Sequence, residues 1–273
     1  MKYRIVHASE YQYSTPAALS LNEACLGARP TPVQTVESHS FVTVPFDDYH
    51  RDRTDWFGNR WRFYAFEKPH VRLRIISTHE VDVNRGARWG DGEVAGWEPF
   101  VHRSTFVPVS PMFADYGRPS FPAGGDRAEG LADLTRRLFR DFTYDPKATE
   151  ISTPVEEFFT ERKGVCQDFS HLMLAVLRSL GIPARYVSGY LNTLPPPGKE
   201  KVFGADASHA WVQAWAPGYG WIDLDPTNGI VVGDDHITLA WGRDYGDVTP
   251  LRGVVLGGGT QKLKVEVTVT ALF

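Results

Sequence analysis

Cysteine is scarce in this chain: its 273 residues include only Cys25 and Cys166. Two cysteines exclude a disulfide-stapled scaffold, and they cannot build a zinc site without several well-placed histidines. No run of 18 apolar residues occurs, so we expect no membrane-spanning segment. The first residues also lack the apolar core of a signal peptide. The sequence therefore predicts a cytoplasmic protein with reduced thiols.

The chain also has no excess of positive charge. Lys and Arg number 29 against 33 Asp and Glu, the formal net charge is −4, and no basic stripe is present. We therefore do not expect a nucleic-acid partner. The hydrophobic content of 42% and the charged content of 23% are those of an ordinary globular protein.

The most informative stretch begins at Cys166. Gly164 precedes the cysteine, and Gly181 with Ile182-Pro183 closes the segment that the cysteine opens. Apolar residues recur inside it at three- and four-residue steps: Phe169, Leu172, Met173, Val176, Leu177 and Leu180. The pattern predicts a helix packed on a core, with Cys166 in its first turn. The unpaired N–H groups and the dipole at that end favour a thiolate.

The chain divides into three parts by pattern. Residues 1–83 alternate apolar and polar side chains between turn signals, which predicts a β-rich module. Residues 84–128 contain several prolines and glycines and are expected to form an irregular bridge. Residues 129–273 are expected to form the catalytic core, which ends in a strictly alternating C-terminal strand at 263–269.

Two strands in this core predict a hairpin. They run from His209 to Trp215 and from Trp221 to Leu224, and Pro217-Gly218 lies in the connection. Folding the chain there sets His209 nearly opposite Asp225. Facing residues in an antiparallel pair lie about 4.5–5.5 Å apart at the base of their side chains, so a carboxylate would lie beside an imidazole. A slip of one residue would turn one of them to the other face.

Cys166, His209 and Asp225 stand in the order and on the elements that Cys–His–Asp acyl transfer requires. His209 would take the proton of Cys166, Asp225 would orient the imidazole, and the thiolate would attack an amide carbonyl. The backbone N–H of Cys166 is the natural first donor to the oxyanion. Candidates for the second donor, and for contact with the substrate, are Gln167, Tyr190 and Trp211. The sequence does not rank these three residues.

Each triad residue also has a plain structural alternative. A cysteine is often a small buried hydrophobe, a strand histidine is often a hydrogen-bonded core residue, and Asp225 could simply form a turn. Their order and placement together favour a site. Cys25 has no evident base nearby, and we expect it to be structural. His171 follows Cys166 by about 1.4 helical turns, so we expect it to form a structural hydrogen bond.

Several stretches together resemble the transglutaminase-like superfamily, and the first resembles its bacterial cysteine-peptidase-like branch. They are Gly164-Val165-Cys166-Gln167-Asp168-Phe169, residues 177–190, Ser208-His209-Ala210-Trp211-Val212 and Asp225-Pro226-Thr227. The core resemblance covers roughly residues 140–230. Asp55-Trp56-Phe57-Gly58-Asn59 lies in a segment that resembles the β-rich N-terminal region accompanying such bacterial proteins.

The resemblance implies an α+β, papain/transglutaminase-like core. In it, a cysteine at a helix N-terminus packs against an antiparallel sheet that carries the histidine and the aspartate. It makes Cys166 the nucleophile, His209 the base and Asp225 the third member. Asp225 is chosen over Asp223 because the family's aspartate precedes Pro-Thr. Animal transglutaminases need calcium, but Asp234-Asp235 is too little for a calcium loop, and we predict no metal or other cofactor.

We therefore predict a cysteine-dependent amide hydrolase that acts on a protein or peptide through a thioester. The family also contains crosslinking enzymes, amidases and inactive members, so two alternatives stay open. One is a transglutaminase that joins a glutamine side chain to a primary amine. The other is a non-catalytic module that binds peptides in the same groove.

Overall fold

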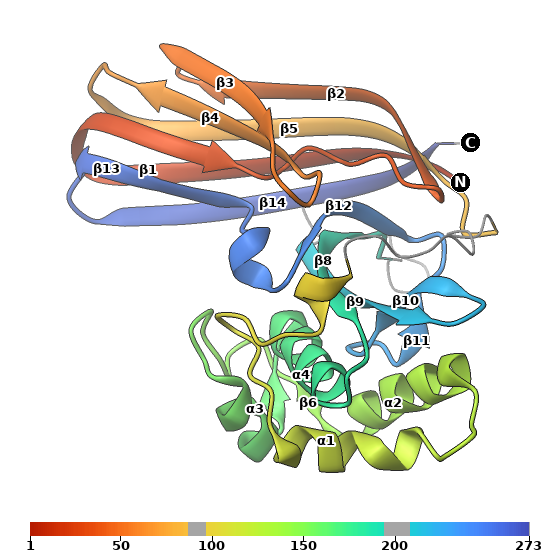
Figure 1. The fold of residues 1–273 in the computed structure, drawn as a ribbon. Coiled ribbons are helices and arrows are strands. Elements are labelled where there is room, and N and C mark those ends of the chain that lie inside the picture. Colours follow the sequence, from red (N-terminus) through yellow and green to blue (C-terminus); the bar gives the residue numbers. More distant parts are fainter. Residues whose placement is uncertain (87–96, 194–207, 273) are drawn as a thin grey trace, which may run out of the picture.

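A computed structural model describes residues 1–86, 97–193 and 208–272 of the chain. A large antiparallel sheet, a smaller antiparallel sheet and a group of helices lie one on another (Figure 1). The fold is thus mixed, with a β-rich N-terminal part, as the sequence predicts. In the described ranges, no helix is both long enough and apolar enough to cross a membrane.

The large sheet has the strand order β2-β5-β1-β4-β3, and β13 and β14 pair with β1. Its strands are β1 (Lys2–Ala24), β2 (Gln34–Val44), β3 (Tyr49–Thr54), β4 (Arg60–Phe66), β5 (His70–Val83), β13 (Leu251–Gly257) and β14 (Gln261–Leu272). The alternation read from the sequence is visible in β1, where Tyr3, Ile5 and His7 are buried between more exposed neighbours. β1 is long enough to pair with four other strands of the sheet.

The C-terminal strand lies in this first sheet. β14 pairs with β1 from Lys2 opposite Leu272 to Tyr13 opposite Gln261, and the two chain ends lie near each other (Figure 1). A strand is present where the alternation predicts one, but its assignment to the catalytic core is wrong. Alternation reports one buried face and carries no information about which sheet supplies the partner strand.

The second sheet has the order β11-β10-β9-β8-β12. Its strands are β8 (Ala184–Leu191), β9 (Ser208–Ala216), β10 (Gly220–Asp225), β11 (Ile230–Val231) and β12 (His236–Gly242). The longer helices are α1 (Pro111–Gly117), α2 (Arg127–Asp141), α3 (Val155–Glu161) and α4 (Cys166–Ser179). Short elements complete the fold: η1 (Glu98–Phe100), η2 (Arg118–Ser120), η3 (Tyr245–Asp247) and the parallel pair β6 (Thr143–Tyr144) and β7 (Lys163–Gly164). The predicted irregular bridge therefore contains short helices, and its residues 87–96 lie outside the described ranges.

Helix α4 is central to the fold, and every residue from Asp168 to Arg178 is buried. The sequence predicts one apolar face, but the polar side of the helix is covered as well. Arg178 is accommodated there because its guanidinium donates to the carbonyl oxygens of Ala184 at 2.9 Å and His102 at 3.3 Å. His171 Nε2 accepts the N–H of Tyr245 at 3.2 Å, which is the structural hydrogen bond expected for it.

The two sheets are joined through the edge strand β12. The side-chain amide of Gln34 exchanges two 2.8 Å hydrogen bonds with the backbone N–H and C=O of Thr238. Asn59 does the same with Trp241, at 3.0 and 2.8 Å. These amides satisfy backbone groups that an edge strand would otherwise leave open. Side chains from the first sheet therefore satisfy the open edge of the second sheet.

Candidate active site

Cys166 is the first residue of α4, and its backbone is fixed by contacts around the helix start. Asp168 Oδ2 accepts the N–H of Val165 at 2.8 Å and the hydroxyl of Thr149 at 2.6 Å. Gly164 makes this approach possible, because a Cβ at that position would lie 2.5 Å from Asp168 Oδ2. The thiol is partly exposed at the end of the helix where free N–H groups gather.

His209 and Asp225 meet, although not as directly facing residues. The β9–β10 register pairs Leu224 with Val212, which sets Asp225 across from Trp211 and two residues along from His209. The predicted register is therefore wrong by two residues. A shift of two keeps both side chains on the same face, and His209 Nε2 lies 2.8 Å from Asp225 Oδ2.

The Asp225 carboxylate is fully buried and densely hydrogen-bonded. Oδ1 accepts the N–H groups of Thr227 at 3.0 Å and Asn228 at 3.1 Å. Oδ2 accepts from Asn228 Nδ2 at 2.7 Å and lies 2.9 Å from His236 Nε2, in addition to His209. Burial opposes ionisation, but the hydrogen bonds from the two histidines outweigh it and hold the pKa of Asp225 well below its usual range.

The electrostatics favour a charged imidazole at His209. Burial lowers the pKa of His209, but hydrogen bonds to Asp225 and to Cys166 outweigh it and raise the pKa to about 10. Since Nε2 is engaged by Asp225, Nδ1 is the ring nitrogen left to face the thiol. The arrangement can therefore hold a thiolate beside an imidazolium, which is the reactive form of such a pair.

The three candidates for a second oxyanion donor lie in different surroundings. Trp211 is fully buried and donates its indole N–H to Asp223 Oδ1 at 2.8 Å. Tyr190 is also fully buried, with its hydroxyl 2.9 Å from His7 Nδ1 in the first sheet. Neither side chain is placed to reach a substrate, so both assignments are wrong. Gln167 is half-buried next to Cys166, and its amide donates to the carbonyl of Ile151 at 3.0 Å.

Family comparisons agree with this architecture. The model of the transglutaminase-like superfamily matches residues 121–226, and that of the bacterial transglutaminase-like N-terminal region matches residues 3–82. An uncharacterised protein of Mycobacterium tuberculosis is 36% identical over 274 residues, covering 93% of this chain and 87% of the relative. This chain belongs to the transglutaminase-like superfamily.

Three further proteins show how far the likeness extends. An uncharacterised protein of Mycobacterium leprae is 33% identical and covers 99% of both chains. A protein-glutamine gamma-glutamyltransferase of Pseudomonas aeruginosa is 36% identical over 123 residues, which cover 38% of this chain and 18% of that enzyme. The solved structure of a candidate cysteine protease from Cytophaga hutchinsonii shares the fold, with a TM-score of 0.80 over 100% of this chain and 91% of that one, at 23% identity.

The structure of this transglutaminase-like chain adds residues that the sequence did not indicate. Asn228 and His236 both contact the Asp225 carboxylate. The Asp-Pro-Thr-Asn turn could have suggested Asn228, whereas His236 lies 11 residues from Asp225 and reaches it only through the sheet. Tyr144 pairs with Gly164, two residues before the nucleophile, and is 54% exposed. It is therefore exposed on the strand that pairs with the segment leading to Cys166.

One group of possible metal donors occurs within the described residues. Donor atoms of His209, Asp225 and His236 lie within 4.8 Å of one another. The Nε2 atoms of the two imidazoles are already hydrogen-bonded to Asp225 Oδ2, at 2.8 and 2.9 Å. The cluster is thus occupied by its own hydrogen bonds, and we assign no metal ion to it.

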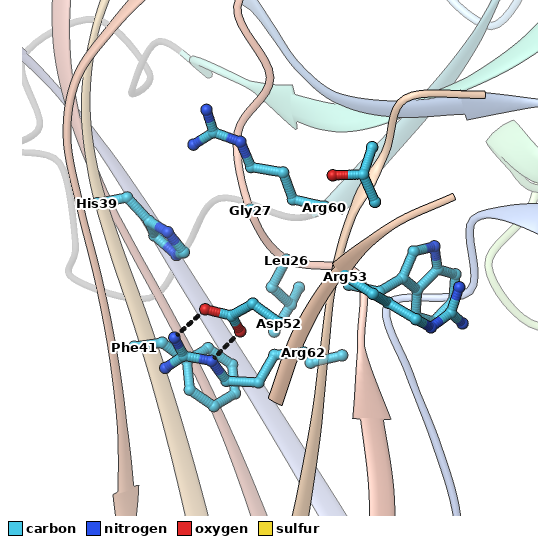
Figure 2. A pocket seen from close by; sticks show the side chains of 11 residues that line it. Leu26, Gly27, His39, Phe41, Asp52, Arg53, Arg60 and Arg62 are labelled. Atoms are coloured by element: carbon cyan, nitrogen blue, oxygen red, sulfur yellow. Dashed lines mark hydrogen bonds and ion pairs between the residues drawn. The ribbon is translucent and has the colours of Figure 1, made fainter. Parts of the chain in front are cut away.

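A cavity of about 450 Å³ lies in the first sheet, apart from the triad residues (Figure 2). Its lining includes His39, Phe41 and Arg60, together with a bidentate pair in which Arg62 binds Asp52 at 2.6 and 2.7 Å. None of the triad side chains line this cavity, so it is separate from the candidate active site.

Proposed function

We propose that this protein is a cysteine-dependent amide hydrolase that acts on a protein or peptide substrate through a thioester intermediate. The observation that supports this most directly is the 2.8 Å hydrogen bond between His209 and the buried Asp225, beside a Cys166 thiol that helps to raise the pKa of His209. Cysteine, base and orienting carboxylate occur here in the roles that nucleophilic acyl transfer needs.

The proposed reaction follows from these positions. The Cys166 thiolate attacks the amide carbonyl, and the oxyanion is stabilised by the Cys166 backbone N–H at the start of α4. The His209 imidazolium gives its proton to the leaving amine, and the carbon–nitrogen bond breaks to leave a thioester. His209 then takes a proton from water, which attacks the thioester, breaks the carbon–sulfur bond and releases a carboxylic acid, leaving the Cys166 thiolate beside the His209 imidazolium as at the start. Asp225 keeps the ring oriented throughout.

A second candidate is transfer to an amine in place of water. The partial match to the Pseudomonas aeruginosa gamma-glutamyltransferase favours this alternative, since the matched segment is 36% identical. The thioester would form in the same way, and a primary amine would attack it. Tyr144, exposed beside Gly164, would lie near the entering group in either reaction.

The test uses unfolded, lysine-methylated casein with and without a fluorescent primary amine. Hydrolysis predicts new α-amino termini that are absent with Cys166→Ala, while excess EDTA and added calcium change the rate less than about twofold. Fluorescence incorporated at glutamine would establish the transferase in place of the hydrolase. Loss of activity with EDTA, restored by calcium, would overturn the metal-independent mechanism. Binding of casein with neither product would favour the non-catalytic module.

A further inference from the structure

His236 shares a carboxylate oxygen with the candidate base. It is the first residue of β12, its side chain is 2% exposed, and its Nε2 lies 2.9 Å from Asp225 Oδ2. The same oxygen is 2.8 Å from His209 Nε2. The two rings are 5.7 Å apart between centroids. One acceptor therefore serves two imidazoles, and His209 is the one whose pKa the Cys166 thiol also helps to raise.

The proton on His236 is fixed by its surroundings. Its Nδ1 is buried and has no hydrogen-bond partner in the part of the chain that the structure describes. The proton consequently lies on Nε2 and is donated to the carboxylate. The ring packs edge-on against Trp211, at 5.2 Å and 84°, and the His236 carbonyl accepts from Arg85 Nη2 at 3.0 Å. His236 is thus a fixed N–H donor.

We propose that His236 is a positioning residue for the reaction, a role that rests on the proposed function. His236 orients the Asp225 carboxylate toward His209, and it weakens the hold of that carboxylate on the imidazolium proton. A carboxylate that accepts more N–H groups is a weaker base. His209 is then held in place without being made too poor an acid for the leaving amine. His236 is buried and acts only through Asp225.

Among the described residues, two other carboxylates near these rings have partners of their own. Arg85 Nη1 lies 2.9 Å from Asp223 Oδ2, and Asp235 accepts from the Tyr3 hydroxyl at 3.0 Å. Cys166 faces His209 from α4. Asp225 is therefore the carboxylate through which a change at His236 reaches His209.

The test compares His236→Phe, which keeps a ring against Trp211 but cannot donate, with His236→Gln, whose amide can donate from a similar position. His236→Phe should lower kcat about tenfold while KM stays within about twofold of the wild-type value. It should also raise the pKa of His209 by roughly 0.5–1, as measured from the ¹⁵N chemical shifts of the imidazole. His236→Gln should keep kcat within about threefold, and the pKa of His209 within about 0.3, of the wild-type values. His79→Phe is the control, because His79 is equally buried with an unpartnered Nδ1 but lies in β5. It should leave the His209 titration unchanged.

Unchanged kcat and His209 pKa in His236→Phe would overturn the proposal. Equal losses in His236→Phe and His236→Gln, with equal loss of thermal stability, would show a purely structural role and also overturn it. The imidazole titration needs no substrate. A shifted His209 pKa in a protein that hydrolyses no amide would therefore support the role of His236 while the proposed function failed.

Discussion

At the scale of single residues, the two cysteines show how surroundings decide chemistry. Cys25 is 2% exposed, and burial raises the pKa of its thiol to about 12. Cys166 is partly exposed, begins a helix and has His209 beside it. The same side chain is therefore inert in one place and a candidate nucleophile in the other.

Iodoacetamide at neutral pH should alkylate Cys166 at least about 100-fold faster than Cys25, because only Cys166 combines access with a helix start and a neighbouring imidazole. Peptide mapping by mass spectrometry gives the two rates in one sample. Denatured protein is the control, in which both thiols should react alike. Similar rates for both thiols in the folded protein would remove the case for an activated Cys166.

Asp225→Asn should lower turnover by on the order of 10²–10³, since an amide cannot offset the imidazolium charge. The matched control is Asp223→Asn, on the same strand. Asp223 holds Trp211 and Gln213 and pairs with Arg85, so this change should lower the thermal midpoint but cost less than roughly tenfold in turnover. Steady-state kinetics on one substrate compares the two. A severe loss in Asp223→Asn with a mild one in Asp225→Asn would reverse the assignment.

At the scale of elements, the sequence predicts those helices and strands whose ends depend on neighbouring residues. The helix predicted after Cys166 is observed as Cys166–Ser179, and Gly181 follows it with φ of 72°. The β9–β10 register was missed by two residues, because the turn occupies residues 217–219 between Ala216 and Gly220 and its exact position sets the pairing. Long-range neighbours were also missed: Tyr190 meets His7 across 183 residues, so its burial against the first sheet has no local signal.

Gly189 in β8 shows how tightly the second sheet is packed under Trp211. A Cβ there would lie 2.2 Å from the Ile237 carbonyl oxygen and 2.4 Å from Trp211 Cη2. Gly189→Ala should therefore cost about 3 kcal/mol or more in unfolding free energy, measured by denaturant titration. Gly233→Ala, where nothing lies within 4 Å, should stay within about 0.5 kcal/mol. Equal stabilities would contradict the packing described for this sheet.

At the scale of the whole molecule, the N-terminal sheet is part of the structure that supports the site. Gln34 and Asn59 close the edge of β12, the strand that carries His236. β14 returns the end of the chain to β1. The sequence divides the chain into a module, a bridge and a core, because local patterns show each part separately. Contacts between distant segments join them.

Buried histidines should make the molecule sensitive to mild acid. Burial lowers the pKa of His7 to about 4, of His79 to about 3 and of His171 to about 4. The unfolded chain binds protons at these residues below about pH 6.5, whereas the folded chain does not, so the stability that these three histidines contribute is full above that pH and falls toward pH 4. The raised pKa of His209 does not offset this, since its contribution is constant below pH 6.5.

The thermal midpoint should accordingly fall between pH 6.5 and pH 5 at constant ionic strength, measured by circular dichroism. His7→Gln should reduce the slope, because one of the protons taken up on unfolding is removed. A midpoint that stays level or rises over this range would mean that these imidazoles are not held neutral in the folded protein.

The most direct test of the central claim is a ¹⁵N titration of the His209 imidazole in the wild-type protein and in Cys166→Ala. The geometry places this ring between a buried carboxylate and the thiol, with its pKa raised to about 10. The imidazole should therefore be protonated at pH 8, lose its proton as the pH rises toward 10, and titrate at lower pH in Cys166→Ala. A neutral His209 at pH 7, with a titration that Cys166→Ala leaves unchanged, would contradict the ion-paired triad on which this account rests.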